Sequence, residues 1–263
     1  MPRLSVTVIT RNEAADLARA LESVRWADEV IVVDCGSTDG TVAVARRFTD
    51  RITVRPWPGY IEQKNFAASQ ATHDWILSLD ADERVTPELA AAIKAVMAEE
   101  PVHSGFEMAR VTWYLGRWIR STDWYPDKQL RLYDRRRARW AGQYVHEHVA
   151  IEGTTGRLSG ELQHYPYRDI AEHLETIDRY TTLSARQMYE QGRRAGVLQQ
   201  AFHPPFAFLR NYVLRGGIRE GAPGFTISAL NAYYVFLKFA KLWELSTGRR
   251  DRSDVAAGTK PTI

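Results

Sequence analysis

Hydrophobic and polar residues alternate with two different periods over the first hundred positions. Short runs rich in β-branched residues predict strands, and longer stretches with apolar residues three or four apart predict helices. The predicted strands cover residues 6–10, 29–34, 51–54 and 75–80. The first predicted helix begins after Asn12, which would cap it, and the other predicted helices lie at 41–48, at 61–71 and from Pro87 onward. Because strands and helices alternate, the sequence predicts an α/β fold with a doubly wound, mainly parallel sheet.

The pattern changes after Pro101. Two further strands are predicted at residues 104–114 and 128–133, and helical stretches follow at 169–189, 205–215 and 225–245. A glycine-rich segment at 216–224 separates the last two helices. We expect boundaries near residues 100, 168 and 248, and a mobile polar tail at 249–263.

Composition excludes several classes of protein. The chain has 44% hydrophobic and 25% charged residues, as globular proteins do, and its formal charge of +3 is too small to indicate nucleic-acid binding. The single cysteine, Cys35, excludes an internal disulfide. No apolar run reaches the roughly 20 residues of a membrane span, and the first residues do not resemble a secretory signal. We therefore expect a cytoplasmic protein.

Polar residues follow three of the predicted strands, at positions 10–13, 34–39 and 80–83. In an open α/β sheet, ligands bind beyond the carboxyl ends of the strands. Acids clustered there repel one another unless a cation offsets their charge, and a divalent metal carrying a phosphate ester would do so. Asp80 and Asp82 are two positions apart, which puts both carboxylates on one side of an extended chain. The alternative for a single acid, such as Asp39 or Asp82, is to cap the following helix.

Four segments in this order resemble the family 2 glycosyltransferases, which have the GT-A fold. They are residues 8–13, 32–41, 63–65 and 79–83. Later segments at 126–132, 145–147 and 164–167 are similar to the branch that holds lipopolysaccharide core β-glucosyltransferases. The resemblance implies a nucleotide-sugar-binding half at 1–100, the acceptor side of the same GT-A domain at 101–168, and a C-terminal helical extension at 169–248.

The resemblance also implies roles for individual residues. It places Thr10, Asn12 and Glu13 in the nucleotide pocket, and Asp34 on the base or ribose with Ser37 and Asp39 nearby. Asp80-Ala81-Asp82 is similar to the DxD motif, whose last acid holds Mg²⁺ or Mn²⁺ on the diphosphate, and Asp80 is a further candidate ligand of that metal. Lys64 is either a cation near that diphosphate or a solvated helix lysine, and His164 is either a further metal ligand or a structural residue.

Sugar transfer with inversion needs a general base that takes the proton of the acceptor hydroxyl. The resemblance implies an acid after the acceptor-side strands, and Glu147 is the candidate, with Asp127 and Asp123 as alternatives. The other interpretation is that Glu147 pairs with an arginine of residues 131–139. Arg131 and the run at 135–137 either meet phosphates of an acidic acceptor or form a solvated face.

Aromatic and basic residues are interleaved beyond Phe206. That combination is typical of an amphipathic surface on anionic lipid, and a packed core or a dimer interface is the alternative. We therefore expect possible peripheral contact with the inner face of the plasma membrane.

The predicted function is metal-dependent, inverting transfer of a hexose, with UDP-glucose as the expected donor and a lipid-linked saccharide such as a lipopolysaccharide core as the acceptor. A sugar nucleotidyltransferase is the rival enzyme, but it would carry a glycine-rich basic loop after the first strand, which residues 10–13 lack. A non-catalytic saccharide-binding protein is the other rival, and it would not need both Asp80 and Asp82.

Overall fold

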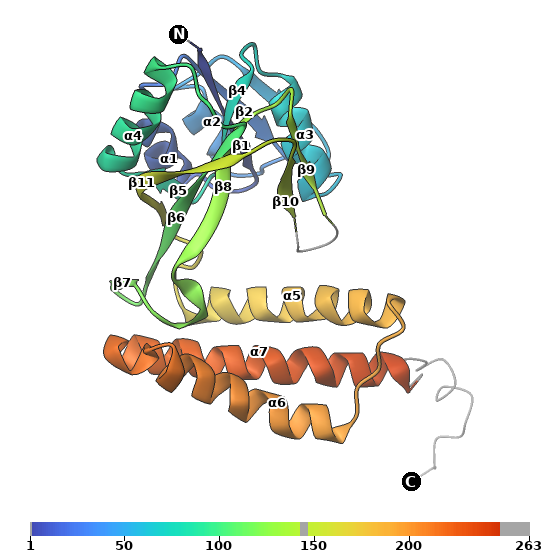
Figure 1. Ribbon diagram of the computed structural model, residues 1–263. Coiled ribbons are helices and arrows are strands. Elements are labelled where there is room, and N and C mark those ends of the chain that lie inside the picture. The colour runs from blue at the N-terminus through green and yellow to red at the C-terminus, as the bar shows by residue number, and fades with distance from the viewer. Residues whose placement is uncertain (1, 143–146, 248–263) are drawn as a thin grey trace, which may run out of the picture. The chain divides into compact units, whose positions relative to one another are not determined.

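The computed structural model describes residues 2–142 and 147–247 and separates into two compact units (Figure 1). Unit 1 holds the described residues up to 120 together with those from 124 to 166. Unit 2 holds residues 121–123 and the described residues from 167 onward. The predicted tail at 249–263 lies outside the described residues, and the predicted division of the α/β region at residue 100 stays a prediction.

Unit 1 is built on one large mixed sheet. Its strands, in chain order, are β1 (Leu4–Thr10), β2 (Glu29–Asp34), β3 (Ile52–Val54), β4 (Trp75–Asp80), β5 (Glu83–Val85), β6 (Gly105–Tyr114), β7 (Arg117–Ile119), β8 (Asp127–Asp134) and β11 (Thr155–His164). They lie in the order β3-β2-β1-β4-β8-β6-β11-β5, with β7 paired to β6. The first four strands and the β6–β11 pair are parallel, whereas β8 is antiparallel to both of its neighbours.

Helices cover both faces of this sheet. They are α1 (Leu17–Ser23), α2 (Thr41–Ala45), α3 (Tyr60–Ser69) and α4 (Pro87–Ala98). Along β2, Val32 packs in the cluster that contains α1 and α4, and its neighbours Ile31 and Val33 pack in the cluster that contains α3. This alternation follows from the period of two in a strand and explains why the run is apolar throughout. It confirms the predicted α/β class with a mainly parallel sheet.

Local capping signals set some of the helix ends. Thr86 accepts a hydrogen bond from the Leu89 backbone, and α4 begins at Pro87, where the sequence predicts a helix. The first helix is present as predicted, but its predicted cap was wrong, because α1 begins at Leu17 and Asn12 does not cap it. Asn12 instead adopts a left-handed backbone conformation with φ of 57° and bonds the neighbouring loop.

A separate two-stranded sheet, β9 (Ala138–Ala141) and β10 (His148–Ile151), packs against the α3 side of unit 1. Residues 143–146 lie between these strands and outside the described residues, so the predicted motif at 145–147 is described only at Glu147.

Unit 2 is the predicted C-terminal helical extension. It contains α5 (Ile170–Glu190), α6 (Val197–Leu209), a π-helical turn (Arg210–Leu214), a 3₁₀ turn (Gly217–Glu220) and α7 (Ala222–Ser246). The helix predicted to begin at Pro205 begins earlier, at Val197. Pro204 and Pro205 lie inside this helix, α6, and do not mark its start. Apolar residues of α5 and α7 meet in a cluster that includes Met188, Phe239 and Leu242. No helix in the described part of the chain is long and apolar enough to cross a membrane.

Candidate active site

Two loops at the carboxyl ends of β1 and β2 are tied together by side-chain hydrogen bonds. The Asn12 carboxamide oxygen accepts from the Thr38 backbone at 2.9 Å, and the Asn12 backbone donates to Ser37 Oγ at 2.8 Å. The Glu13 backbone donates to Thr41 Oγ1 at 2.8 Å. The predicted nucleotide-pocket residues Asn12, Glu13 and Ser37 therefore belong to one compact loop pair.

Thr10 and Asp34 lie beneath these loops. Thr10 Oγ1 is buried and has no hydrogen-bond partner among the described residues, so a ligand or water atom would satisfy it. Asp34 is fully buried, and its carboxylate accepts from the backbones of Gly36 and Ser37 at 2.9 and 2.8 Å. Asp34 shapes its own loop in this arrangement, and the nucleotide contact predicted for it stays a prediction.

Asp39 holds the start of α2. Its carboxylate accepts from the backbones of Thr41 and Ala14 at 3.0 and 3.2 Å. The hydrogen bond from the Thr41 hydroxyl is the main reason why the pKa of Asp39 lies below its ordinary value. The capping interpretation therefore fits Asp39, in addition to its place beside the loop pair.

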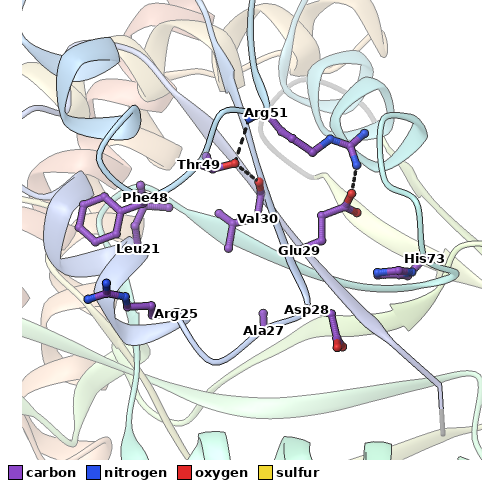
Figure 2. Close-up of a pocket in the computed structure, with 10 residues that line it drawn as sticks. All are labelled: Leu21, Arg25, Ala27, Asp28, Glu29, Val30, Phe48, Thr49, Arg51 and His73. Atoms are coloured by element: carbon purple, nitrogen blue, oxygen red, sulfur yellow. Dashed lines mark hydrogen bonds and ion pairs between the residues drawn. The ribbon is translucent and has the colours of Figure 1, made fainter.

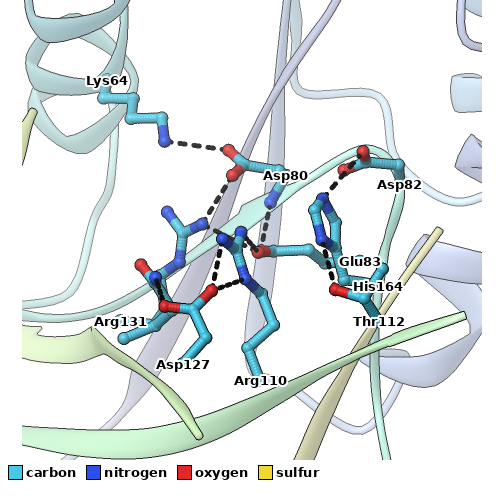
Figure 3. Close-up of polar contacts among 10 residues, drawn as sticks. Lys64, Asp80, Asp82, Glu83, Arg110, Thr112, Asp127, Arg131 and His164 are labelled. Carbon is cyan, nitrogen blue, oxygen red and sulfur yellow. Dashed lines mark hydrogen bonds and ion pairs between the residues drawn. The ribbon is translucent and has the colours of Figure 1, made fainter. Parts of the chain in front are cut away.

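The first acid of the DxD-like motif is enclosed by two cations (Figure 3). Lys64 Nζ lies 2.9 Å from Asp80 Oδ1, and an Arg131 guanidinium nitrogen lies 2.6 Å from Asp80 Oδ2. Burial alone would raise the pKa of Asp80, but these two cations outweigh it and hold the pKa far below its usual range. Asp80 therefore stays ionised, and its two oxygens are already engaged.

Lys64 and Arg131 are both almost fully buried, with side chains 4% and 3% exposed. Lys64 Nζ also lies 4.2 Å from the ring centroid of Trp140, in a cation–π contact. The solvated-lysine interpretation of Lys64 is therefore wrong. Arg131 is not on a solvated face either, because it lies inside the same network.

Glu83 connects the network across three strands. Its carboxylate is inaccessible to solvent and binds Arg131 at 2.8 Å and Arg110 at 2.9 Å, and it accepts the Asp80 backbone N–H at 3.0 Å. Arg110 in turn binds Asp127 at 2.6 Å. The sequence places Glu83 in the acidic cluster at 80–83 but predicts no partner for it, and it does not point to Arg110. The signal for Glu83 was its place three residues after Asp80, but nothing local marks Arg110.

The second acid of the motif faces a histidine. Asp82 Oδ2 lies 3.3 Å from His164 Nε2, and Thr112 Oγ1 lies 3.4 Å from the other ring nitrogen, Nδ1 (Figure 3). Burial would raise the pKa of Asp82, but the charge and hydrogen bond of His164 lower it below its ordinary value. The pairing of β11 with β5 sets this geometry, since it places His164 opposite Glu83.

Asp82 and His164 suit a divalent metal that is shared with a substrate. Carboxylate oxygen is a preferred ligand of Mg²⁺ and Mn²⁺, and imidazole is acceptable to Mn²⁺. Among the described residues, no group of three or more His, Cys, Asp or Glu side chains could hold a metal ion by itself. The protein therefore offers two ligands here, and diphosphate oxygens would supply others. Ala81, between the two acids, turns into the core and is 5% exposed.

The three candidate bases differ in their surroundings. Asp127 binds Arg110 and accepts from Gln129 at 2.7 Å, and Asp123, which belongs to unit 2, pairs with Arg210 and Arg215. Glu147 is half-buried at the start of the β10 segment. No ion pair joins Glu147 to an arginine in the described part of the chain, so the pairing interpretation is not supported.

The arginine run at 135–137 serves the fold. Arg135 donates to the backbone carbonyls of Ala68 and Ala71 at 3.0 and 2.7 Å. Arg136 pairs with Asp134 at 2.7 Å. These contacts lie at the amino end of β4, because Asp134 is paired with Trp75.

Comparisons with known proteins place the chain among the glycosyltransferases. Residues 5–156 match the family described as Glycosyl transferase family 2. The chain is 34% identical to the lipopolysaccharide core biosynthesis glycosyltransferase LpsC of Rhizobium meliloti, over 92% of both chains. It is 33% identical to an uncharacterized glycosyltransferase of Rickettsia typhi, over 95% of this chain and 90% of that one.

Solved structures give more distant similarities. Residues 1–349 of TarS from S. aureus align with a TM-score of 0.46 and 13% identity, over 95% of this chain and 93% of that one. A glucosyl-3-phosphoglycerate synthase from Mycobacterium tuberculosis, solved with Mg²⁺ and UDP, aligns with a TM-score of 0.35 and 22% identity, over 43% and 44%. The family match confirms the resemblance and the GT-A type fold that it implies. The chain belongs to glycosyl transferase family 2 and is a glycosyltransferase.

Proposed function

We propose that this glycosyltransferase is metal-dependent and inverts the anomeric centre as it moves a hexose onto a lipid-linked saccharide. Glucose from UDP-glucose is the first donor to test, and a lipopolysaccharide core is the first acceptor. The acceptor class rests on the similarity to LpsC, which covers nearly the whole chain. The cytoplasmic face of a membrane is where such an acceptor would be met.

One observation carries the proposal: Asp82 and His164 face each other at 3.3 Å beside an acid that is already neutralised. Asp80 is held by Lys64 and Arg131, so it orients the turn without competing for a second cation. Asp82 and His164 would hold Mg²⁺ or Mn²⁺, which as a Lewis acid stabilises the charge that develops on the departing nucleoside diphosphate. Residues 10–14 and 34–41 would bind the nucleoside.

Glu147 is the proposed general base. A carboxylate whose oxygens are already bound by guanidinium groups is less available to the hydroxyl of an acceptor. Arg110 neutralises Asp127, and Arg210 and Arg215 neutralise Asp123. Glu147 is free of such a pair among the described residues, and its half-buried position leaves it open to an acceptor hydroxyl.

The first experiment tests the metal site with Asp82→Asn. Nucleotide sugars are screened for Mn²⁺-dependent thermal stabilisation and for slow hydrolysis. A ligand at 100 times its Kd adds about 2.7 kcal/mol to the free energy of unfolding. We expect Asp82→Asn to lose the metal-dependent part of that stabilisation and to lower kcat/KM by about 100-fold or more. Asp50→Asn, which changes an exposed acid of the same unit, is the control. An unchanged Mn²⁺-dependent shift in Asp82→Asn would contradict the proposal.

A second variant, Glu147→Gln, separates donor binding from transfer. It should keep the donor-dependent stabilisation, because the proposed base acts on the acceptor, and it should lose transfer by about 100-fold or more. Glu152→Gln, an exposed acid on the same segment, serves as its control. Retained turnover in Glu147→Gln would move the role of base to Asp127 or Asp123.

A further inference from the structure

One face of α6 is apolar and exposed. Leu198, Phe202, Phe206, Leu209 and Val213 are spaced at three- to four-residue intervals, so they line one side of the helix and of the π-helical turn that follows. Together with Leu214, they are between 51% and 70% exposed. We call these six residues the α6 apolar face. Contiguous exposed apolar surface of this kind marks an interaction site.

The opposite side of α6 is already used for packing within unit 2. Ala207 is buried, the ring of His203 lies 4.8 Å from that of Phe239, and the ring of Phe208 lies 5.6 Å from that of Phe225. The helix therefore has a filled inner side, and the α6 apolar face is not part of the core of unit 2.

The charge of the surrounding segment identifies the partner. Residues 191–219 contain five arginines and no aspartate or glutamate. Arg210 and Arg215 pair with Asp123, which leaves Arg193 and Arg194 before α6 and Arg219 after it. All three are exposed, and none pairs with a carboxylate in the part of the chain that the structure describes. An apolar helix face with cations at both ends matches an anionic membrane surface.

We propose that the α6 apolar face docks on an anionic lipid bilayer, with its side chains in the acyl–headgroup boundary and Arg193, Arg194 and Arg219 on lipid phosphates. This goes beyond the proposed sugar transfer, because it assigns a lipid-binding surface to unit 2 that needs no donor or metal. A second copy of the chain is the less favoured occupant, since its own arginines would face these. α6 lies in the plane of the interface, in keeping with the lack of a spanning helix among the described residues.

The test is co-sedimentation of the full chain with vesicles, without nucleotide sugar or metal. Vesicles of phosphatidylglycerol and phosphatidylcholine in equal parts are compared with vesicles of phosphatidylcholine alone. We expect the chain to bind the anionic vesicles more tightly, and high salt to reduce that preference. The double variant Phe202→Gln/Phe206→Gln should bind anionic vesicles about tenfold or more weakly. The double variant Arg193→Gln/Arg194→Gln should lose about tenfold, and should do so on anionic vesicles only.

Val102→Gln is the matched control, because it removes an exposed apolar side chain in unit 1 and should bind as the unaltered chain does. If Phe202→Gln/Phe206→Gln fails to fold, as judged by its thermal midpoint, Leu198→Gln replaces it. Equal binding by the apolar-face variant, or no binding of the unaltered chain, would overturn the proposal. So would a dimer that this variant converts to a monomer without any lipid binding. Donor-dependent stabilisation is measured separately, so failure of docking leaves the proposed sugar transfer untouched.

Discussion

The two ends of the large sheet both carry acids, but these acids bind different kinds of partner. At the amino end, Asp28 accepts from the Leu4 backbone at 2.8 Å, and Glu29 accepts from the Thr72 backbone at 2.8 Å and pairs with Arg51. These groups border a cavity of about 370 Å³ (Figure 2). Asp28 and Glu29 thus each bind a backbone N–H of a neighbouring segment.

At the carboxyl end, Asp34 and Asp39 also bind backbone N–H groups, but the acids that follow β4 bind mainly side chains. Asp80 and Glu83 are held by Lys64 from α3, Arg110 from β6 and Arg131 from β8. An acid that binds backbone groups stabilises the local fold. Acids that bind side chains from several elements hold those side chains, and one another, in place. At the carboxyl end, Asp82 and His164 therefore lie beside a buried network of ion pairs, which is the kind of support that the proposed site would need.

The largest effect expected from this comparison is that of Glu83→Gln. Glu83 is buried between Arg110 and Arg131, so removing its charge leaves two buried guanidinium groups short of a partner. Breaking a buried ion pair from one side costs about 4 kcal/mol. We expect urea unfolding to show a loss of that order, and donor affinity to fall with it. A loss below about 1 kcal/mol would mean that the network is not what holds the carboxyl end.

A smaller effect is expected at the amino end from Asp134→Asn. Burial would raise the pKa of Asp134, but hydrogen bonds from Arg136 outweigh it and lower the pKa. The ionised form therefore stabilises the folded state above the unfolded pKa of about 3.9, and this stabilisation is lost as the pH falls through the folded pKa. Urea unfolding should therefore show that the free energy of unfolding of Asp134→Asn changes less with pH than that of the unaltered chain. An unchanged dependence would show that the ionised Asp134 does not stabilise the folded state.

The smallest effect is expected from Glu29→Gln. Its partner Arg51 is 46% exposed, so solvent screens the ion pair, and such pairs contribute about 0.5 kcal/mol. The variant should lose that much free energy of unfolding and keep its kcat/KM per folded molecule. A drop in kcat/KM larger than twofold would show that the two ends of the sheet are coupled.

The α/β class, the carboxyl-end location of the acids and the C-terminal helices could all be predicted from the sequence. Periodicity decides these features, because buried strands such as Glu29–Asp34 are continuous apolar runs and α5 has a regular apolar stripe. The predicted start of α6 was wrong because of two prolines. Pro204 and Pro205 suggested a helix start, but packing of the inner side of α6 on α7 keeps them inside the helix.

The partners of the acids could not be predicted. Arg110 meets Asp127 because β6 and β8 are antiparallel in a register that places these two residues opposite each other. That register depends on how the whole sheet assembles, and no local pattern encodes it. For the same reason, Lys64 was as compatible with a solvated helix face as with the buried contact to Asp80 that the structure contains. Roles of single residues toward donor and acceptor stay predictions.

The position of β11 has a consequence for the order in which the chain matures. β11 lies between β6 and β5 in the sheet. The strand that follows the acid motif, β5, therefore pairs with a segment that is synthesised about 80 residues later. At about 5–20 residues per second, a ribosome takes roughly 4–16 seconds to cover that distance. During this interval β5 lacks its partner strand β11, and Asp82 lacks the His164 ring that faces it in the folded chain. Under the proposed metal site, a nascent chain therefore cannot complete the Asp82–His164 pair until synthesis has passed His164.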